Sequence, residues 1–592
     1  MSAFRGEEES FLQAKNTFDE PILPHESIVH TEDISENFGS LFLSSDMSDV
    51  ILRVEGKDLP AHRVVLAARS KYFRALFFGG MKEETEKIVE LKETPLEPFT
   101  NLLQYIYTGC LCLHGKDEDF ILEILGLAHR CDFQRLQTDI ALYFKKSLDT
   151  RNVCTILHLS QLYCLPSLTE ACFLFADRNA SEILLSSSFL SLPSTSVEEL
   201  ISRHSFCAPE IDIFRAICRW KEARTEDEYG SCLSSLVSRL RLPLISLDQL
   251  LNVVRPSGLI ESDTILDAIK EQSETTSSNL THRGFQTPNL NVATSGTANV
   301  ISGECPSALL LPPDSMAVQD GDRVLTRHVI GEDNEGIVVE LSNPFIINKI
   351  VLVLWDRGDR EQRVYSYYVE VSIDRKDWAR IIDHTKYLCR SRQNLLFPPR
   401  AVKYIRVVGT HTSSSSLYFI LVHLEALFST ETFQIDPTTQ LTIPEKNIAC
   451  IDRNALVIEG VSRCRNALLN GQITDYDWDN GYTCHQLGSG SITVQLPQPY
   501  LVSSIRLLLW DCDERYYSFY IEVSVNQQHW KRVVDRVKDE CRAWQYAEFP
   551  PEPVVFIRIV GTHNSANEVF HCVHLECPAN SSSIDGSPSI ID

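Results

Sequence analysis

The spacing of hydrophobic residues changes once along the chain, after the polar stretch of residues 271–279. Before that stretch, apolar side chains recur three and four positions apart, as at Ile213, Phe214 and Ile217, and this period predicts amphipathic helices. Beyond it, apolar side chains take alternate positions, which predicts antiparallel strands that are buried on one face only. In the clearest run, Glu370 is expected on the polar face, and the predicted buried side chains are Tyr367, Val369, Val371 and Ile373.

The first hundred residues add one short strand and several helix boundaries to this pattern. The alternation of valine and leucine over residues 50–54 predicts a strand. Ser70 stands at the N-cap position of a helix, and the pair Gly79-Gly80 ends that helix. A helical pattern then runs from Pro98 to Asp149, with a break at Thr108-Gly109. The joints between later helices are predicted at Pro166, Pro209, Pro243 and Pro256.

The strand-rich region contains the same sequence signals twice, at a constant offset of 152 residues. The matched residues are Tyr365 and Tyr517, Trp378 and Trp530, Arg406 and Arg558, and Gly409 and Gly561. A period of this length is too long for a propeller blade or a solenoid turn, so each copy is predicted to be a whole domain. Two copied domains without a shared catalytic signature favour a binding surface over a single active site.

Composition narrows the classes of partner. The 592 residues include 55 basic and 80 acidic side chains, a net charge of −25, which argues against nucleic acid and anionic membranes as ligands. No run approaches the roughly 18 apolar residues of a membrane span, so we expect no membrane insertion. The 18 cysteines are spread along a chain that shows no signal peptide. We therefore expect reduced thiols and a cytoplasmic protein.

Three sets of motifs resemble known domain families. Ser48-Asp-Val-Ile-Leu-Arg-Val, followed by Ala61-His-Arg-Val-Val-Leu-Ala-Ala and Tyr105-Ile-Tyr-Thr-Gly, resembles a BTB/POZ domain. The run that begins Pro209-Glu-Ile-Asp-Ile-Phe resembles the helical BACK domain. Each duplicated unit, with Tyr-Ser-x-Tyr-x-Glu-Val-Ser and Ile-Arg-x-Val-Gly-Thr-His, resembles the coagulation factor V/VIII type C, or discoidin-like, domain, which is a jelly-roll β-sandwich.

These resemblances imply a multidomain chain. It would consist of an α/β BTB domain, an all-α BACK domain and two all-β jelly-roll sandwiches. The expected boundaries are a flexible acidic arm at 1–33, the BTB domain at 34–148, the BACK domain at 149–270, a linker at 271–284, sandwich 1 at 285–428, a linker at 429–443, sandwich 2 at 444–578 and a disordered tail at 579–592.

The resemblance to BTB domains also implies sites. Ligase adaptors of this family carry a hydrophobic-x-acidic motif that binds cullin 3, and Met81, Lys82 and Glu83 match it after the glycine helix stop. The characteristic polar residues of the BTB core are Asp49, His62 and Arg63. Two interpretations of these three stay open: a charged pair of Asp49 and Arg63 near the face of a BTB homodimer, or caps and buried polar contacts within the domain.

The loop Asp475-Tyr476-Asp477-Trp478-Asp479 is the candidate ligand loop of the second sandwich. Its aromatic residues are suited to anchor a protein or a sugar, and the alternative is a solvated acidic turn. The pattern of a calcium loop fails, because Gly481 comes one residue late and Gln486 replaces a glutamate. No lysine or arginine lies between Arg465 and Arg506, which argues against phospholipid.

No metal site or cofactor is predicted. His571-Cys572-Val573-His574 reads as a strand, because alternate residues face opposite sides and only two ligands share a face. In extracellular members of the discoidin-like family, a disulfide joins the domain ends. Cys577 occupies the terminal position in copy two, but Ala426 occupies it in copy one. The disulfide is therefore missing from at least one copy.

The predicted function is that of a non-enzymatic substrate adaptor of a cullin 3 ubiquitin ligase. The BTB domain would dimerise and bind cullin 3, and the paired sandwiches would capture a protein substrate, whose identity the sequence leaves open. Enzyme signatures such as Gly-x-Ser-x-Gly, His-Glu-x-x-His and a phosphate loop do not occur in the sequence. The alternatives are a dimeric scaffold without ligase activity and a module that senses a glycan or a cation.

Overall fold

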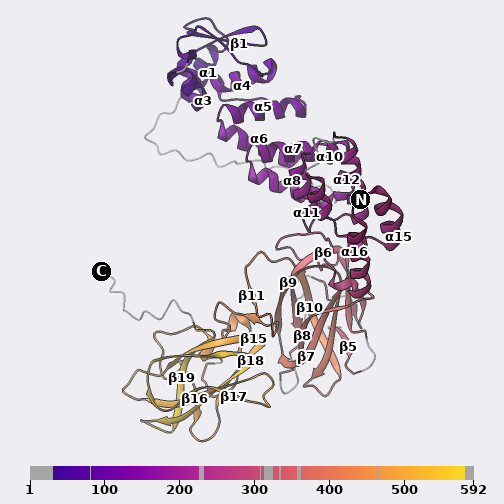
Figure 1. Ribbon diagram of the computed structural model, residues 1–592. Helices are drawn as coiled ribbons and strands as arrows, with labels where there is room; N and C mark the ends of the chain where they lie inside the picture. The colour runs from indigo at the N-terminus through magenta and orange to yellow at the C-terminus, as the bar shows by residue number, and fades with distance from the viewer. Residues whose placement is uncertain are drawn as a thin grey trace, which may run out of the picture. The chain divides into compact units, whose positions relative to one another are not determined.

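The structure is a computed structural model, and it describes residues 31–80, 82–225, 232–306, 309–311, 325–331, 335–356, 362–464, 466–479 and 481–579. The chain divides into two compact units, Met1–Cys172 and Phe173–Asp592 (Figure 1). Of the predicted N-terminal arm, residues 31–33 form the first turn of a helix and the others lie outside the described residues. Met81 and all of the predicted tail except Ala579 also lie outside them.

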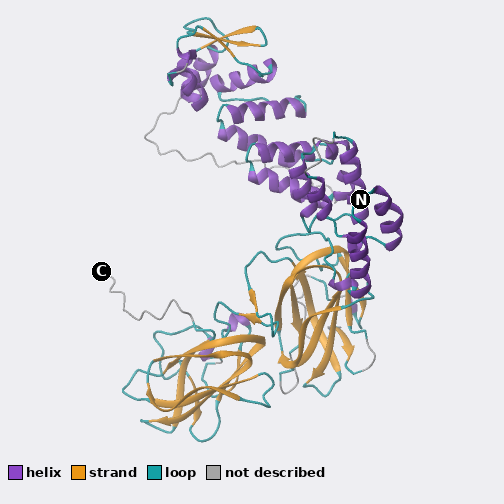
Figure 2. Cartoon of the chain, viewed as in Figure 1, coloured by secondary structure: helices purple, strands orange, loops and turns teal. Residues whose placement is uncertain are grey.

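The first unit opens with a small sheet and surrounding helices (Figure 2). Strands β1 (Val50–Val54), β2 (Lys57–Ala61) and β3 (Ile88–Glu90) lie in the order β2-β1-β3. β1 runs antiparallel to β2 and parallel to β3, and its alternating burial confirms the predicted strand. The helices of this domain are α1 (Thr31–Ser40), α2 (Arg63–Arg69), α3 (Lys71–Phe78), α4 (Leu96–Thr108), α5 (Glu118–Arg130) and α6 (Gln134–Ser147).

Local chemistry sets the helix ends in this domain as predicted. The Ser70 hydroxyl accepts a hydrogen bond from the Phe73 backbone N–H at 3.3 Å, which caps α3. Gly109 ends α4 in the left-handed conformation, with φ of 72°, which a residue without Cβ adopts at little cost.

Two further helices belong to the first unit. These are α7 (Val153–Leu162) and the start of α8 (Pro166–Arg178), and contacts with α5 explain the grouping. The rings of His129 and Tyr163 stack with centroids 4.8 Å apart. The Asn152 amide donates to the Glu118 carboxylate at 2.7 Å. The compact unit therefore extends to Cys172, beyond the predicted domain boundary at residue 148.

The second unit begins with a helical domain. Its helices are α9 (Ala180–Leu185), α10 (Ser187–Ser191), α11 (Ser194–Ser202), α12 (Glu210–Glu222), α14 (Leu233–Ser238), α15 (Leu247–Gln249) and α16 (Ser262–Glu274). In α12, Ile213, Phe214 and Ile217 are buried together with Trp220, as their spacing predicts. Trp220 also donates its ring N–H to the Leu192 carbonyl at 2.9 Å, so the buried polar atom is satisfied.

The predicted linker of residues 271–284 is ordered and fixed to the domains on both sides. Its first residues continue α16 to Glu274, and a 3₁₀ turn follows at Ser277–Asn279. The Gly284 N–H donates to the His204 carbonyl of the helical domain at 3.1 Å. The next residue, Phe285, donates its N–H to the Pro344 carbonyl of the first sandwich at 2.8 Å.

The two copies of the duplicated unit fold with the same strand topology. The first contains β4 (Ala298–Ser302), β5 (Thr326–Val329), β6 (Ile337–Leu354), β7 (Tyr365–Ser372), β8 (Ala379–Cys389), β9 (Arg392–Thr412) and β10 (Tyr418–Leu427). The second contains β13 (Leu456–Glu459), β14 (Thr483–Gln486), β15 (Ile492–Leu509), β16 (Tyr517–Ser524), β17 (Lys531–Cys541), β18 (Trp544–Asn564) and β19 (Val569–Glu576).

The strand orders are β5-β10-β6-β9-β7-β8 and β14-β19-β15-β18-β16-β17, with β4 and β13 pairing with β6 and β15. The long central strands contain breaks in register, for example between Glu340 and Phe345 in the pairing of β6 with β9. Such bulges bend a strand, so each long strand curves around a single apolar core (Figure 2). Between the sandwiches, β11 (Gln434–Ile435) pairs with β12 (Thr442–Ile443).

The polar face predicted for the strand at 365–372 is also covered. Glu370 in β7 is only 8% exposed, because Arg406 of β9 pairs with its carboxylate and Arg380 of β8 lies 3.2 Å from it. The Arg406 guanidinium lies over the Trp378 ring at 4.1 Å from its centroid. Glu522, Arg558 and Trp530 repeat this arrangement in the second sandwich, with a ring distance of 3.9 Å. The repeated charged and aromatic residues therefore cover the outer face of each sheet.

The sandwiches contact each other through main-chain and amide groups. The Gln498 side chain accepts the Asn394 N–H at 2.5 Å and donates to the Asn394 carbonyl at 2.9 Å. Gln393 and the Arg390 N–H donate to the Pro497 carbonyl at 2.8 and 3.0 Å. Because these groups are paired across the boundary, the two sandwiches form a fixed tandem.

All 18 cysteines are free thiols in the structure. Cys577, at the end of the second sandwich, is buried and unpaired with another cysteine. Burial raises the pKa of the Cys572 thiol to about 12, so this side chain behaves as a small apolar group at neutral pH.

We expect acid to destabilise the first sandwich through His384. Its ring nitrogen lies 3.1 Å from the Tyr367 hydroxyl in the core, and burial lowers its pKa to about 3. The unfolded chain binds a proton below pH of about 6.5 that the folded chain excludes, so the free energy of unfolding falls as pH falls, by about 2 kcal/mol at about pH 5. Urea unfolding near pH 7.5 and near pH 5 measures the loss.

The variant His384→Gln should lose less stability between these two pH values than the wild type. His529→Gln, which changes an exposed histidine of the second sandwich, should behave as the wild type does. Equal acid sensitivity of the wild type and His384→Gln would contradict the prediction.

Candidate functional site

The BTB-like domain presents a short turn whose backbone is fixed by one arginine. Lys82 and Glu83 lie in a 3₁₀ turn, Lys82–Glu84, directly after the end of α3. The Arg63 guanidinium donates to the carbonyls of Glu83 at 3.1 Å, Glu84 at 2.8 Å and Glu86 at 2.5 Å. The same guanidinium lies 4.9 Å from the centroid of the Phe77 ring. Arg63 therefore ties the turn to α2 and α3.

This turn combines charge with an exposed aromatic ring. Phe78, the last residue of α3, is 58% exposed. Glu83 is half-buried, and Lys82 pairs with Glu86 at 2.8 Å. An exposed apolar side chain at the end of α3 and charged side chains on the turn that follows are groups that a protein partner can recognise.

Asp49 and His62 form contacts inside the domain. The Asp49 carboxylate accepts the backbone N–H of Arg63 at 2.8 Å, at the first turn of α2. His62 Nε2 lies 2.8 Å from the Asp46 carbonyl and must donate to it, so Nδ1 of the neutral ring accepts the Tyr107 hydroxyl at 2.8 Å. The structure thus places Asp49 at the start of a helix and the Arg63 guanidinium at the turn of residues 83–86.

A row of apolar side chains is exposed on and after α1. Ile34 and Phe38 are one helical turn apart and are 58% and 45% exposed. Leu43 and Met47 follow, and Met47 is 71% exposed. We call these four residues the α1 apolar surface. Exposed apolar residues gathered in this way mark an interaction surface.

The predicted ligand loop of the second sandwich lies at the edge of an aromatic cluster. Trp478 is 45% exposed, and its ring centroid lies 4.1 Å from that of the buried Trp510. The rings of Tyr482 and His571 contact the Trp478 indole edge-on, with centroid distances of 5.7 and 5.5 Å. Trp510 Nε1 is buried and has no hydrogen-bond partner among the described residues.

Two carboxylates of this loop, Asp477 and Asp479, have different partners. Asp479 pairs with Arg463, whereas the Asp477 carboxylate accepts the Asp479 N–H at 2.9 Å inside the turn. Tyr476 donates its hydroxyl to Asp511, and burial together with this carboxylate raises the pKa of Tyr476. Within the described residues, no three histidine, cysteine or acidic side chains are grouped so as to hold a metal ion.

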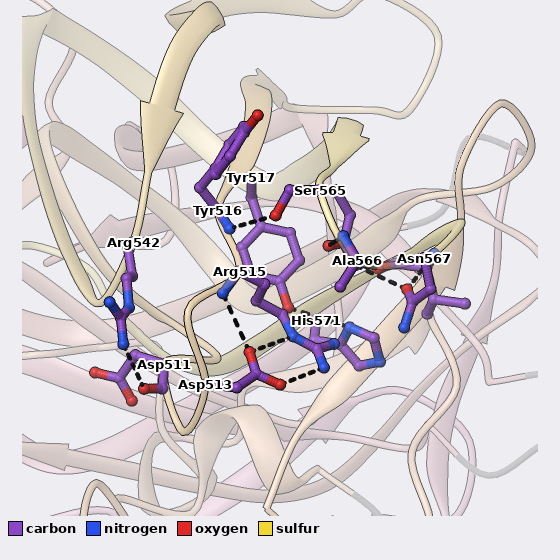
Figure 3. A network of polar contacts seen from close by, with 12 residues as sticks. Asp511, Asp513, Arg515, Tyr516, Tyr517, Arg542, Ser565, Ala566, Asn567 and His571 are labelled. Atoms are coloured by element: carbon purple, nitrogen blue, oxygen red, sulfur yellow. Dashed lines mark hydrogen bonds and ion pairs between the residues drawn. The ribbon is translucent and has the colours of Figure 1, made fainter.

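The fold brings to this cluster a cation that the loop sequence lacks. Arg515 lies 4.9 Å from the Trp478 ring centroid and pairs with Asp513, its Nε donating to that carboxylate at 2.6 Å (Figure 3). The Tyr517 hydroxyl oxygen lies 3.3 Å from His571 Nδ1. Burial and the nearby Arg515 lower the pKa of His571 to about 4, so the ring is neutral at pH 7. A cation distant in sequence thus lies beside a loop that has no lysine or arginine between Arg465 and Arg506.

A sequence signal for these residues existed in the repeat. Asp513-x-Arg515-x-Tyr517 has the counterpart Glu361-x-Arg363-x-Tyr365 at the same offset of 152 residues. His571, Cys572 and His574 lie on β19, as the strand interpretation predicts.

Within the described residues, no helix has the length and apolar character needed to cross a membrane. Comparison with family profiles matches residues 38–148 to the BTB/POZ domain, residues 153–255 to "BTB And C-terminal Kelch", and residues 316–421 and 462–575 to the F5/8 type C domain. These matches confirm the predicted fold classes. Such domains are typical of non-enzymatic interaction proteins.

Two relatives of the same name match this chain over most of their length, and a third protein matches it over less than half. "BTB/POZ domain-containing protein 9" of Homo sapiens is 49% identical over 559 residues, which cover 94% of this chain and 89% of that protein. The Drosophila melanogaster protein of the same name is 48% identical and covers 92% of this chain and 74% of its own length. "Kelch-like protein 24a" of Danio rerio is 29% identical over 235 residues, 39% of this chain and 38% of that protein.

The BTB and BACK portions thus resemble those of Kelch-like adaptors, which supports a protein-interaction adaptor role. Because the identity is near one half and extends over nearly the whole chain, this chain belongs to the BTB/POZ domain-containing protein 9 family.

Proposed function

We propose that this chain is a non-enzymatic, cytoplasmic substrate adaptor of a cullin 3 ubiquitin ligase. The observation that carries the proposal is the turn of residues 82–86, which Arg63 fixes through three backbone carbonyls. Glu83 and Lys82 lie on that turn, and Met81, which lies outside the described residues, precedes it. A turn with a fixed backbone loses little conformational entropy when a partner binds.

A second surface of the first unit supports a broad protein contact. A hollow of about 1090 Å³ is lined by residues of the β3–α4 segment, α5 and α7. Five acidic side chains line it, together with two cations and several leucines: Glu55, Glu90, Glu93, Asp119, Glu123, Lys92, Arg130, Leu122, Leu127 and Leu159. A lining in which acidic side chains outnumber cations and alternate with leucines suits a basic and apolar segment of a partner.

We propose that the α1 apolar surface mediates a BTB homodimer. A twofold contact uses the same patch on both subunits, so one row of apolar residues is sufficient. Dimerisation places two sandwich tandems in one complex and raises the effective concentration of substrate near the ligase.

In this proposal the sandwich tandem captures a protein substrate through the cluster around Trp478. A large, partly exposed indole beside a cation is typical of a binding anchor. The same cluster also favours a second candidate function, recognition of a glycan, since a sugar ring stacks on an exposed indole. The third candidate is a dimeric scaffold without ligase activity, which needs only the α1 apolar surface.

The double substitution Met81→Ala plus Glu83→Ala should reduce cullin 3 binding at least about tenfold, because it removes the apolar anchor and the carboxylate together. Titration of the purified full chain with the N-terminal domain of cullin 3 by calorimetry measures the loss. Asp139→Ala, which removes an exposed carboxylate from α6, serves as the matched control and should bind normally. Equal affinity of the double variant and the wild type would remove this turn from the interface.

The substitution of both Ile34 and Phe38 by glutamate should convert a dimer into a monomer, because two buried carboxylates would lie at the twofold contact. Light scattering coupled to size exclusion reports the mass. Leu266→Glu places the same charge on an exposed leucine of α16 and should leave the dimer intact. A wild-type chain that is already monomeric at micromolar concentration would refute this contact.

Trp478→Ala should lower the yield of proteins that co-purify with the full chain from proteasome-inhibited cells, and the ubiquitin conjugates of those proteins should decline in parallel. Truncation of a central aromatic anchor costs about 2 kcal/mol or more of binding free energy. Tyr546→Ala removes an exposed aromatic residue of β18 and is the control. An unchanged set of partners for Trp478→Ala would assign substrate capture to another surface.

A further inference from the structure

A cavity of about 730 Å³ lies where the helical domain, residues 279–286 and the first sandwich meet. His204 contributes from the helical domain, and Arg380 and Arg400 contribute from β8 and β9. The apolar part of the wall consists of Ile346, Ile381, Phe397, Pro398, Pro399 and Phe428. Its volume falls within the range of about 300–1,000 Å³ that is usual for small-molecule sites.

The segment of residues 279–283, which contributes to the cavity wall, is held to the helical domain by hydrogen bonds. The Arg283 guanidinium, 3% exposed, pairs with Glu210 at 2.5 Å and donates to the Ile201 and Arg203 carbonyls, both at 2.7 Å. Arg241 donates to the Thr281 carbonyl at 3.1 Å. The cavity is therefore formed before any ligand arrives, which lowers the entropic cost of binding.

The charged side chains that line the cavity, Arg380 and Arg400, are both cations. Arg241 can only donate, so His204 Nδ1, 3.0 Å away, accepts, and the other ring nitrogen of His204 carries the proton. Burial and the nearby Arg241 and Arg283 lower the pKa of His204, so this neutral form persists at pH 7. None of the described residues that line the cavity is acidic, although the whole chain carries a net charge of −25.

Comparison of the two sandwiches shows that the positive charge of Arg400 is present only in the first copy. Phe397-Pro-Pro-Arg400 corresponds to Phe549-Pro-Pro-Glu552 at the offset of 152 residues. Glu552 forms an ion pair with Lys531 on the surface of the second sandwich. The same structural position thus carries a cation at the cavity in one copy and an anion in the other. Burial lowers the pKa of Arg400.

We propose that this cavity binds a small organic anion, with its phosphate or carboxylate group at Arg400 and Arg380 and its apolar part against Phe397 and Pro398. A planar guanidinium pairs with the oxygens of either acid group. The prolines and phenylalanines provide apolar area that inorganic phosphate alone would not use. This site is separate from the BTB surfaces and from the Trp478 cluster, so it does not depend on the adaptor proposal.

Calorimetric titration of the purified full chain with phenyl phosphate and with benzoate tests the site. Inorganic phosphate and benzyl alcohol are the two partial ligands, one with the charge alone and one with the ring alone. At least one organic anion should bind at least about tenfold more tightly than either partial ligand, because charge and apolar contact add. The stronger of phenyl phosphate and benzoate identifies the acid group that the site prefers.

The chain contains a matched pair of control substitutions. Arg380 and Arg532 occupy the same position in the two copies, each pairing with an aspartate three residues on, at 3.2 and 3.1 Å, and each lying over a tyrosine ring, at 3.8 and 3.7 Å. Only Arg380 lines the cavity. Arg400→Gln should weaken anion binding at least about tenfold, and Arg380→Gln should weaken it about threefold. Arg532→Gln should not change the affinity for the anion.

Several results would overturn the proposal. The first is that the full chain binds neither organic anion at millimolar concentration. The second is that benzyl alcohol binds as tightly as phenyl phosphate and benzoate. The third is that the folded Arg400→Gln variant binds the anion with unchanged affinity. If thermal melting shows that Arg400→Gln does not fold, the comparison of Arg380→Gln with Arg532→Gln decides. Equal affinities of that pair would then refute the site.

Discussion

The buried ion pair of Arg283 and Glu210 determines how the chain passes from its helices into its sandwiches. Their side chains are 3% and 2% exposed, and two backbone carbonyls accept hydrogen bonds from Nη1 of the guanidinium. Removal of one partner would leave a buried charge, at a cost of about 3–5 kcal/mol. The adjoining segment forms one wall of the cavity near Arg400, so the ion pair helps to hold that wall in place.

The duplication separates scaffold from function. Both copies retain the pairing of a glutamate with an arginine that stacks on tryptophan, as in Glu370, Arg406 and Trp378. Both also place a glycine where a Cβ would lie 2.3 Å from a phenylalanine ring carbon, at Gly409 and Gly561. These shared residues maintain the sheets. The copies differ at the position of Arg400, which lines the cavity in the first sandwich, whereas its counterpart Glu552 pairs with Lys531.

In the BTB domain, one side chain connects the start of α2 to the turn of residues 82–86. Arg63 starts α2, and its backbone N–H is accepted by Asp49, while its guanidinium reaches the carbonyls of residues 83–86. The geometry of the turn is therefore set by the core of the domain. An arginine suits this task better than a lysine, because its planar group donates several hydrogen bonds in fixed directions.

The sequence alone determined the four-domain architecture, the repeat and most helix and strand positions, because hydrophobic period, glycine and proline act locally. It did not determine that Glu370 would be buried, since only the fold brings Arg380 and Arg406 over it. Likewise the Trp478 loop carries no cation of its own, and tertiary structure alone places Arg515 against it. Charge compensation and cavities arise between residues distant in sequence, and no local pattern records those distances.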